Sequence, residues 1–138
     1  MDFQRDQLAP LMRNAGFDPS KPTFWLWEGV TMYLGPEEVS SNLSAFAALS
    51  APGSRIALSY LRNRTGRAPR NLILALLGEP LRSAFAPAAM TDLAKSHGWR
   101  VISDTNIQDW LKETPGLRLT HRQIGVQWLE SIWIGDMA

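Results

Sequence analysis

Apolar positions along this chain recur at spacings that predict helices alternating with strands. In residues 4–15 they stand three and four positions apart, the stripe of an amphipathic helix, and Gly16 is well placed to end it. After Pro22, residues 23–27 are almost continuously apolar. Such a run is typical of a strand in the middle of a parallel sheet with helices on either side.

The pattern continues as strand, helix and strand with short links. Gly35-Pro36-Glu37-Glu38 opens a helix with proline and acids in its first turn, and its buried stripe runs to Leu49. Residues 55–61 predict the next strand, which makes a βαβ unit. Further along, the pattern predicts helices at 71–78 and 87–97, a strand at 99–105, a helical turn at 106–116, and a last strand or hairpin at 123–137.

Length and composition describe an ordinary globular domain. The 138 residues predict a single domain, with 45% apolar and 20% charged residues and a net charge of +1. This balance selects neither nucleic acid nor a membrane surface as a partner. The chain has no cysteine, a polar first segment and no apolar run of membrane-spanning length. We therefore expect a cytoplasmic protein.

Several kinds of site lack support in the sequence. No two glycines lie closer than six residues apart, so no glycine-rich phosphate loop is present. His97 and His121 stand alone, which argues against a metal site. No serine has the context of a nucleophile elbow. Four arginines between Arg62 and Arg70 cluster without interleaved aromatic residues, and a solvated loop explains them better than a nucleic-acid site.

Glu28 is the one polar residue that the pattern places at a functional position. It directly follows the apolar run 23–27 and precedes Gly29, which permits close approach of a ligand or backbone. Ligands of open α/β sheets bind at the carboxyl ends of the strands. A carboxylate there is expected to be partly desolvated and to need a cation, a donor or a ligand. The alternative is an acid that caps the next turn by accepting backbone N–H hydrogen bonds.

The stretch "FWLWEGVTMYL", followed by the proline-acid helix start, resembles the leucine carboxyl methyltransferase family, class I enzymes that use S-adenosylmethionine. "GFDPSKPT", "APGSRIALSYL", "GEPLRSAF" and "HGWRVISD" extend the resemblance, in order, over nearly the whole chain. It implies that Asp2, Phe3 and Glu28 contact the cofactor. It also implies that Tyr33 and Tyr60, following the fourth and fifth strands, lie near the substrate cavity, which the helix at 71–77 would help to roof.

The resemblance also implies an α/β fold, a partial Rossmann-like methyltransferase sheet. The 138 residues would supply strands four to seven of the class I fold, in the order 4-5-7-6, with flanking helices. The glycine-rich cofactor loop and the acid that holds the ribose, which the family carries before this point, are not among these residues. The chain alone is therefore expected to be incomplete and inactive as an O-methyltransferase.

Two classes of function follow. The first is an O-methyltransferase half acting on a small-molecule or carboxylate-bearing substrate. The second is a non-catalytic α/β module that uses its vacant sheet edge for protein association. For both, residues 23–27 would form an unpaired aromatic edge without a lysine or bulge. We therefore expect a homodimer, or a partner that supplies the N-terminal half.

Overall fold

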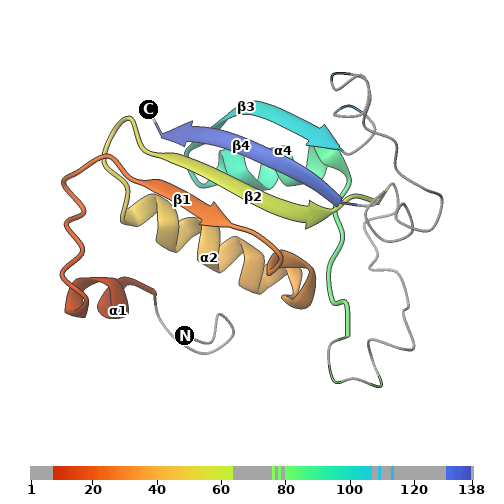
Figure 1. Ribbon diagram of the computed structural model, residues 1–138, viewed down its shortest axis with the longest axis horizontal. Coiled ribbons are helices and arrows are strands. Elements are labelled where there is room, and N and C mark those ends of the chain that lie inside the picture. Colours follow the sequence, from red (N-terminus) through yellow and green to blue (C-terminus); the bar gives the residue numbers. More distant parts are fainter. Residues whose placement is uncertain are drawn as a thin grey trace.

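The computed structural model describes residues 8–63, 76, 78, 80–106, 109, 113 and 130–137. Its helices are α1 (Leu8–Asn14), α2 (Pro36–Ala48), α4 (Pro87–Ser96) and the 3-10 helix η1 (Thr31–Tyr33). Its strands are β1 (Phe24–Trp27), β2 (Arg55–Leu61), β3 (Trp99–Asn106) and β4 (Glu130–Met137). Figure 1 shows these strands side by side in one sheet with helices behind it.

The four strands form one sheet in the order β1-β2-β4-β3. β1 pairs with β2 in parallel, and β4 lies antiparallel between β2 and β3. Chain order along the sheet is therefore first, second, fourth and third, which confirms the 4-5-7-6 arrangement expected for the second part of a class I methyltransferase sheet. Because β4 alone is reversed, β1, β2 and β3 end at the same edge.

Helices α2 and α4 cover one face of this sheet, and tryptophan side chains pack between the helices and the sheet. Trp25 and Trp27 of β1 place their rings 5.0 and 5.3 Å from that of Phe46 on α2. Trp133 of β4, wholly buried, donates its indole N–H to Thr91 Oγ1 of α4 at 3.1 Å. Burial of such rings contributes strongly to stability. Trp25 and Trp27 stand two residues apart in the sequence because both face α2 from the same side of β1.

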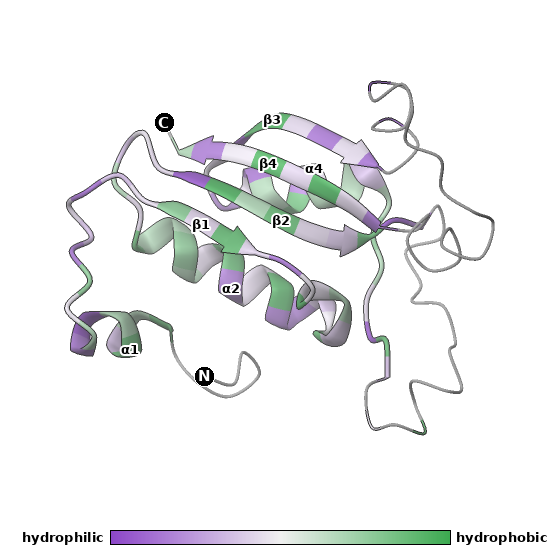
Figure 2. Cartoon of the chain, in the orientation of Figure 1, coloured by the Kyte–Doolittle hydropathy of each residue, from purple (hydrophilic) through white to green (hydrophobic). Residues whose placement is uncertain are grey.

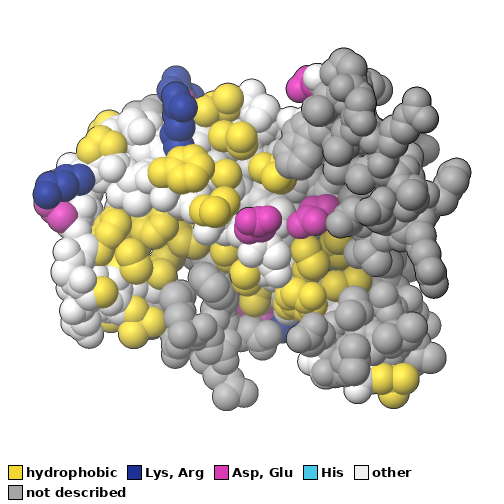
Figure 3. Space-filling model, in the orientation of Figure 1, with side chains coloured by type: hydrophobic (Ala, Val, Ile, Leu, Met, Phe, Trp, Pro, Cys, Tyr) yellow, Lys and Arg dark blue, Asp and Glu magenta, His cyan; other side chains and the backbone are white. Residues whose placement is uncertain are grey.

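The opposite face of the sheet is open over its first strand. Phe24 and Leu26, which alternate with the two buried tryptophans of β1, are 63% and 67% exposed. Figure 3 shows hydrophobic side chains gathered over this face. β1 is thus the edge strand of the described sheet and is buried on one face only, whereas the unbroken apolar run alone suggested burial on both.

Most element boundaries agree with the sequence pattern where the structure describes them. The helix expected from residue 35 begins at Pro36, with Gly35 as its N-cap, and the expected strand 55–61 is β2. In Figure 2 green alternates with near-white along β1, and purple follows just past its end. Most of the helix expected at 71–78, most of the turn expected at 106–116 and all of 123–129 lie outside the described residues. Within the described part, no helix combines the length and apolarity needed to cross a membrane.

Candidate functional site at the carboxyl edge of the sheet

Three polar residues far apart in the sequence lie toward the edge of the sheet at which β1, β2 and β3 end. Glu28 directly follows β1, Tyr60 lies one residue before the end of β2, and Asp104 lies two residues before the end of β3. In open α/β sheets this edge is where ligands bind. The geometry therefore supports the region singled out from the sequence and adds Asp104 to it.

Glu28 lies on the surface at the start of a tightly held turn. Its side chain is exposed, so the expectation that it is partly desolvated is wrong for this chain. Val30, not Glu28, is the N-cap of η1, and no side-chain hydrogen bond caps that helix, which removes the capping explanation. Gly29 adopts φ +71°, a conformation that suits glycine, and its N–H donates to Ser59 Oγ at 2.8 Å.

Further hydrogen bonds fix the turn against two neighbouring segments. Thr31, fully buried, donates its Oγ1 hydroxyl to the Ser59 carbonyl at 2.6 Å, and Ser83 donates its hydroxyl to the Thr31 carbonyl at 2.8 Å. The Arg82 N–H donates to the Met32 carbonyl at 2.7 Å. Because these partners come from β2 and from the segment before α4, Glu28 projects from a turn with little freedom to move.

The two predicted tyrosines occupy different environments. Tyr33, half-buried, lies on η1 in the same turn as Glu28. Tyr60 is fully buried within β2 rather than after it, and its hydroxyl donates to Asp104 Oδ2 at 2.7 Å. Its ring also makes an edge contact with Phe85 at 6.5 Å. Burial, and then the neighbouring Asp104 carboxylate, raise the pKa of Tyr60 above its usual range, so its phenol stays protonated.

Other sequence predictions lie elsewhere. Asp2, Phe3 and all of the expected cavity-roofing helix at 71–77 except Leu76 fall outside the part of the chain that the structure describes, so their roles stay predictions. Within that part, no group of three or more histidine, cysteine, aspartate or glutamate side chains could hold a metal ion. Arg62, from the arginine cluster, is half-buried beside Phe85, with which it forms an isolated bridge.

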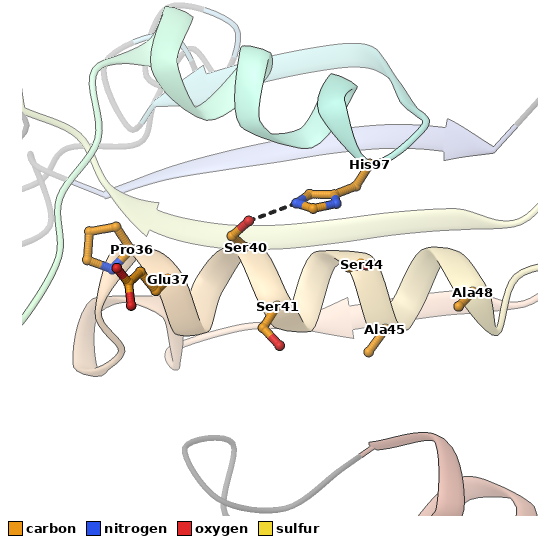
Figure 4. A pocket seen from close by; sticks show the side chains of 8 residues that line it. All are labelled: Pro36, Glu37, Ser40, Ser41, Ser44, Ala45, Ala48 and His97. Atoms are coloured by element: carbon orange, nitrogen blue, oxygen red, sulfur yellow. Dashed lines mark hydrogen bonds between the residues drawn. The ribbon is translucent and has the colours of Figure 1, made fainter.

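A groove of about 680 Å³ runs along the outer side of α2, and the predicted site residues do not line it. Figure 4 shows Ser41 and Ala45 on the side of α2 opposite His97, and the Ser40 hydroxyl hydrogen-bonded to the His97 ring. That hydrogen bond is 2.8 Å long. Most of the residues that line the groove have small side chains, and its histidine, His97, is already hydrogen-bonded to Ser40. The groove does not include the residues at the carboxyl edge of the sheet.

Solved structures share the fold of this chain. A methyltransferase of Thermobifida fusca, described as a candidate enzyme, superposes with a TM-score of 0.62 at 20% identity, over 99% of this chain and 51% of its own. The 1,6-didemethyltoxoflavin-N1-methyltransferase of Burkholderia thailandensis, solved with S-adenosylhomocysteine, gives 0.60 at 14% identity, over 94% and 56%. The described sheet is therefore part of a Rossmann-like methyltransferase fold.

Sequence comparisons also find methyltransferases. The family model for leucine carboxyl methyltransferase matches residues 1–47, which contain Glu28 and its turn. A candidate S-adenosyl-L-methionine-dependent methyltransferase of Mycolicibacterium vanbaalenii is 35% identical over 128 residues, 93% of this chain and 35% of its own length. Another, from Mycobacteroides abscessus, is 34% identical over 116 residues. Residues 1–47 therefore match the leucine carboxyl methyltransferase family, and the chain, which is similar to these methyltransferases over most of its own length, spans about a third of theirs.

Proposed function

We propose that these 138 residues form the C-terminal part of an S-adenosylmethionine-dependent O-methyltransferase. The observation that carries the proposal is Glu28, an exposed carboxylate directly after β1, on a turn held from two sides and inside the segment that matches the family model. No relative's name favours the alternative of a non-catalytic association module.

The argument that S-adenosylmethionine binds here depends on the Glu28 carboxylate. Among the described residues no hydrogen bond or ion pair engages its carboxylate, which leaves both oxygens available to accept hydrogen bonds from a ligand. When bound, S-adenosylmethionine supplies an activated methyl group on a cationic sulfonium. Glu28 would contribute negative charge beside that cation, and Asp2 and Phe3 are proposed as further contacts.

The role of the other residues is to position rather than to react. Methyl transfer to an oxygen needs the acceptor held in line with the methyl group in a dry pocket, and it needs little acid-base chemistry. Tyr33, on the turn of Glu28, and Tyr60, at the same edge, are proposed to line the acceptor side. The acceptor is proposed to be a small molecule or a carboxylate-bearing compound.

The direct test of this function is formation of S-adenosylhomocysteine. The chain, combined with a polypeptide from a relative that carries the glycine-rich loop, would be incubated with S-adenosylmethionine and a library of small carboxylic acids. We expect acceptor-dependent product with an ester among the methylated compounds. Cofactor binding accompanied by methylation of nitrogen or carbon only would contradict O-methyl transfer.

Ser59 offers a test of the turn that carries Glu28. Ser59→Ala removes the acceptor of the Gly29 N–H, and we expect cofactor affinity to fall about fivefold or more because Glu28 is no longer held in place. Ser54→Ala is the matched control, since the Ser54 hydroxyl accepts the Thr23 N–H at 3.0 Å at the other end of β1. Both variants should lose stability, but only the first should lose cofactor affinity in calorimetric titrations of the chain combined with the N-terminal half. Equal losses of affinity would contradict a positioning role.

The exposed edge and open face of β1 suggest what completes the protein. We propose that a polypeptide carrying the N-terminal half of the fold covers them, and that in its absence two copies of the chain pair through Phe24 and Leu26.

Light scattering of the isolated chain should then give a dimer. Leu26→Lys should shift it toward monomer, whereas Leu11→Lys, at an exposed position on α1, should not. A monomer over a wide concentration range would contradict self-association, and slow amide exchange at Phe24 and Leu26 in it would mean that the chain covers its own edge.

The proposal includes a cytoplasmic location. Its support is that the chain has no cysteine with which an oxidising compartment could stabilise it, and that the cofactor is a metabolite of the cell interior. Cell fractionation with an antibody to the protein tests this, and recovery in a secreted or membrane fraction would contradict it.

A further inference from the structure

Arg62 is a partly exposed cation at the carboxyl edge of the sheet, directly after β2. Its backbone is fixed on both sides, because the Phe85 N–H donates to the Leu61 carbonyl and the Asn63 N–H donates to the Phe85 carbonyl, each at 2.9 Å. Arg62 and Phe85 thereby form a parallel bridge just past the end of β2. The Arg62 side chain therefore starts from a fixed point at the edge where ligands of open α/β sheets bind.

The segment that pairs with Arg62 also holds the turn that carries Glu28. Ser83, in that segment, donates its hydroxyl to the Thr31 carbonyl at 2.8 Å. The Thr31 hydroxyl in turn donates at 2.6 Å to the carbonyl of Ser59, three residues before Arg62 in the chain. Arg62 and Glu28 are thus side chains of opposite charge on one hydrogen-bonded assembly, and Arg62 lies about 10 Å beyond Ser59 along the strand direction.

The guanidinium of Arg62 keeps its hydrogen-bonding capacity within the part of the chain that the structure describes. Ion pairs there involve the cations of Lys21, Arg82 and Arg100, and none engages Arg62. An arginine carries five N–H donors in a planar fork that matches the two oxygens of a carboxylate. Such a charge-assisted pair is stronger where the side chain is partly withdrawn from water, as that of Arg62 is.

Tyr60 connects Arg62 to the acceptor side of the proposed site. The Tyr60 hydroxyl donates to Asp104 Oδ2 at 2.7 Å, so this acid is held by the phenol, and it forms no ion pair with Arg62. Burial, and then Asp104, raise the pKa of Tyr60, while the charge of Arg62 acts in the opposite direction. The positive charge of Arg62 is therefore felt at the Tyr60 hydroxyl.

We propose that the guanidinium of Arg62 binds a carboxylate of the methyl acceptor. This inference rests on the proposed methyltransferase function and narrows its substrate to compounds that carry a carboxylate. Three features of the fold support it: Arg62 has a fixed backbone, its side chain is accessible from the carboxyl edge, and it belongs to the same assembly as Glu28.

Benzoate is the probe for the test, because it carries a carboxylate, and benzamide has nearly the same shape without the charge. Backbone amide resonances of the full 138-residue chain would be followed by NMR during titration with each compound at constant ionic strength. We expect saturable shifts centred on Arg62, Asn63 and Phe85 with benzoate alone. Equal shifts with both compounds, or none at these residues, would overturn the proposal.

Variants separate recognition from general charge. Arg62→Gln should weaken benzoate binding at least tenfold, whereas Arg62→Lys, which keeps the charge and loses the planar fork, should retain part of the affinity. Arg13→Gln is the matched control, since Arg13 is an exposed arginine in the last turn of α1, and it should leave benzoate binding unchanged. If Arg62→Gln fails to fold, Arg62→Lys should still weaken binding severalfold. Unchanged binding in either folded variant of Arg62, or an equal loss in Arg13→Gln, would overturn the proposal.

The cofactor also carries a carboxylate, so the same variants would be titrated with S-adenosylmethionine in the presence of the N-terminal polypeptide. Arg62→Gln should leave cofactor affinity within about twofold of the parent and raise the KM for a carboxylate acceptor at least tenfold. An equal loss of cofactor affinity would assign Arg62 to the cofactor and overturn the proposal.

These titrations also distinguish the two levels of the account. Cofactor binding without benzoate binding would refute the role of Arg62 and leave the methyltransferase function standing. Benzoate binding without cofactor binding would refute the methyltransferase function, and with it the identity of the carboxylate as part of a methyl acceptor.

Discussion

Replacing Gly135 with alanine is expected to destabilise the chain by about 2–3 kcal/mol or more, the largest effect that the fold predicts for a single methyl group. A Cβ at this position would collide with the ring of Trp133 and would lie 2.9 Å from the Arg100 carbonyl oxygen. Trp133 is fully buried with its indole N–H bonded to α4, so it cannot swing aside, and the carbonyl belongs to the backbone of β3. Urea denaturation followed by tryptophan fluorescence measures the loss.

Gly35→Ala is the matched control for this prediction. Its added Cβ would meet the carboxylate of Glu38, the end of a surface side chain that can rotate away at the cost of its 3.0 Å ion pair with Arg82. A partly exposed ion pair contributes at most about 1 kcal/mol. Gly35→Ala should therefore unfold at nearly the urea concentration of the parent. Equal destabilisation by both substitutions would mean that the packing of β3, β4 and α4 is not as described.

Replacing Glu28 with glutamine is expected to weaken cofactor binding by about 1–3 kcal/mol, or roughly five- to 150-fold, in an assembly that supplies the N-terminal half. The amide keeps the size of the side chain and removes its charge. Because Glu28 is exposed and caps no helix, thermal stability should remain unchanged. Calorimetric titration with S-adenosylhomocysteine, which lacks the sulfonium charge, should show a smaller loss than titration with S-adenosylmethionine.

Glu37→Gln controls for the loss of a negative charge near the site. Glu37 is exposed in the first turn of α2, nine residues further along the chain, and its charge acts mainly on the end of that helix. Its substitution should leave cofactor affinity within experimental error of the parent. If Glu28→Gln lowers the melting temperature and leaves affinity intact, Glu28 has a structural role and the site lies elsewhere.

The sequence predicted the elements and the order of the strands better than it predicted side-chain environments. Apolar spacing located β1, α2 and β2 within about a residue, because burial of one face demands it. The order of the sheet followed from the family resemblance. Exposure of Glu28 was not foreseen, since it depends on which segments lie beside the carboxyl end of β1.

Residues whose partners lie on other strands were missed for a physical reason. Ser59 interrupts an apolar strand, and Asp104 is an acid within a strand, so each is a polar residue at a position where the pattern predicts a strand. Their roles depend on register, however: Ser59 reaches Gly29 across 30 residues, and Tyr60 reaches Asp104 across 44 residues and past β4. A pattern along one strand does not contain the register of its neighbours.

Calorimetric titration with S-adenosylmethionine, of the 138-residue chain alone and with a polypeptide that carries the glycine-rich loop and the ribose-binding acid, tests the central claim most directly. We expect weak or undetectable binding to the chain alone, because those contacts are not among its residues. With the added polypeptide we expect micromolar affinity, about −8 kcal/mol. Micromolar binding by the chain alone, or none by the assembly, would contradict the claim that Glu28 and its turn are one half of a shared cofactor site.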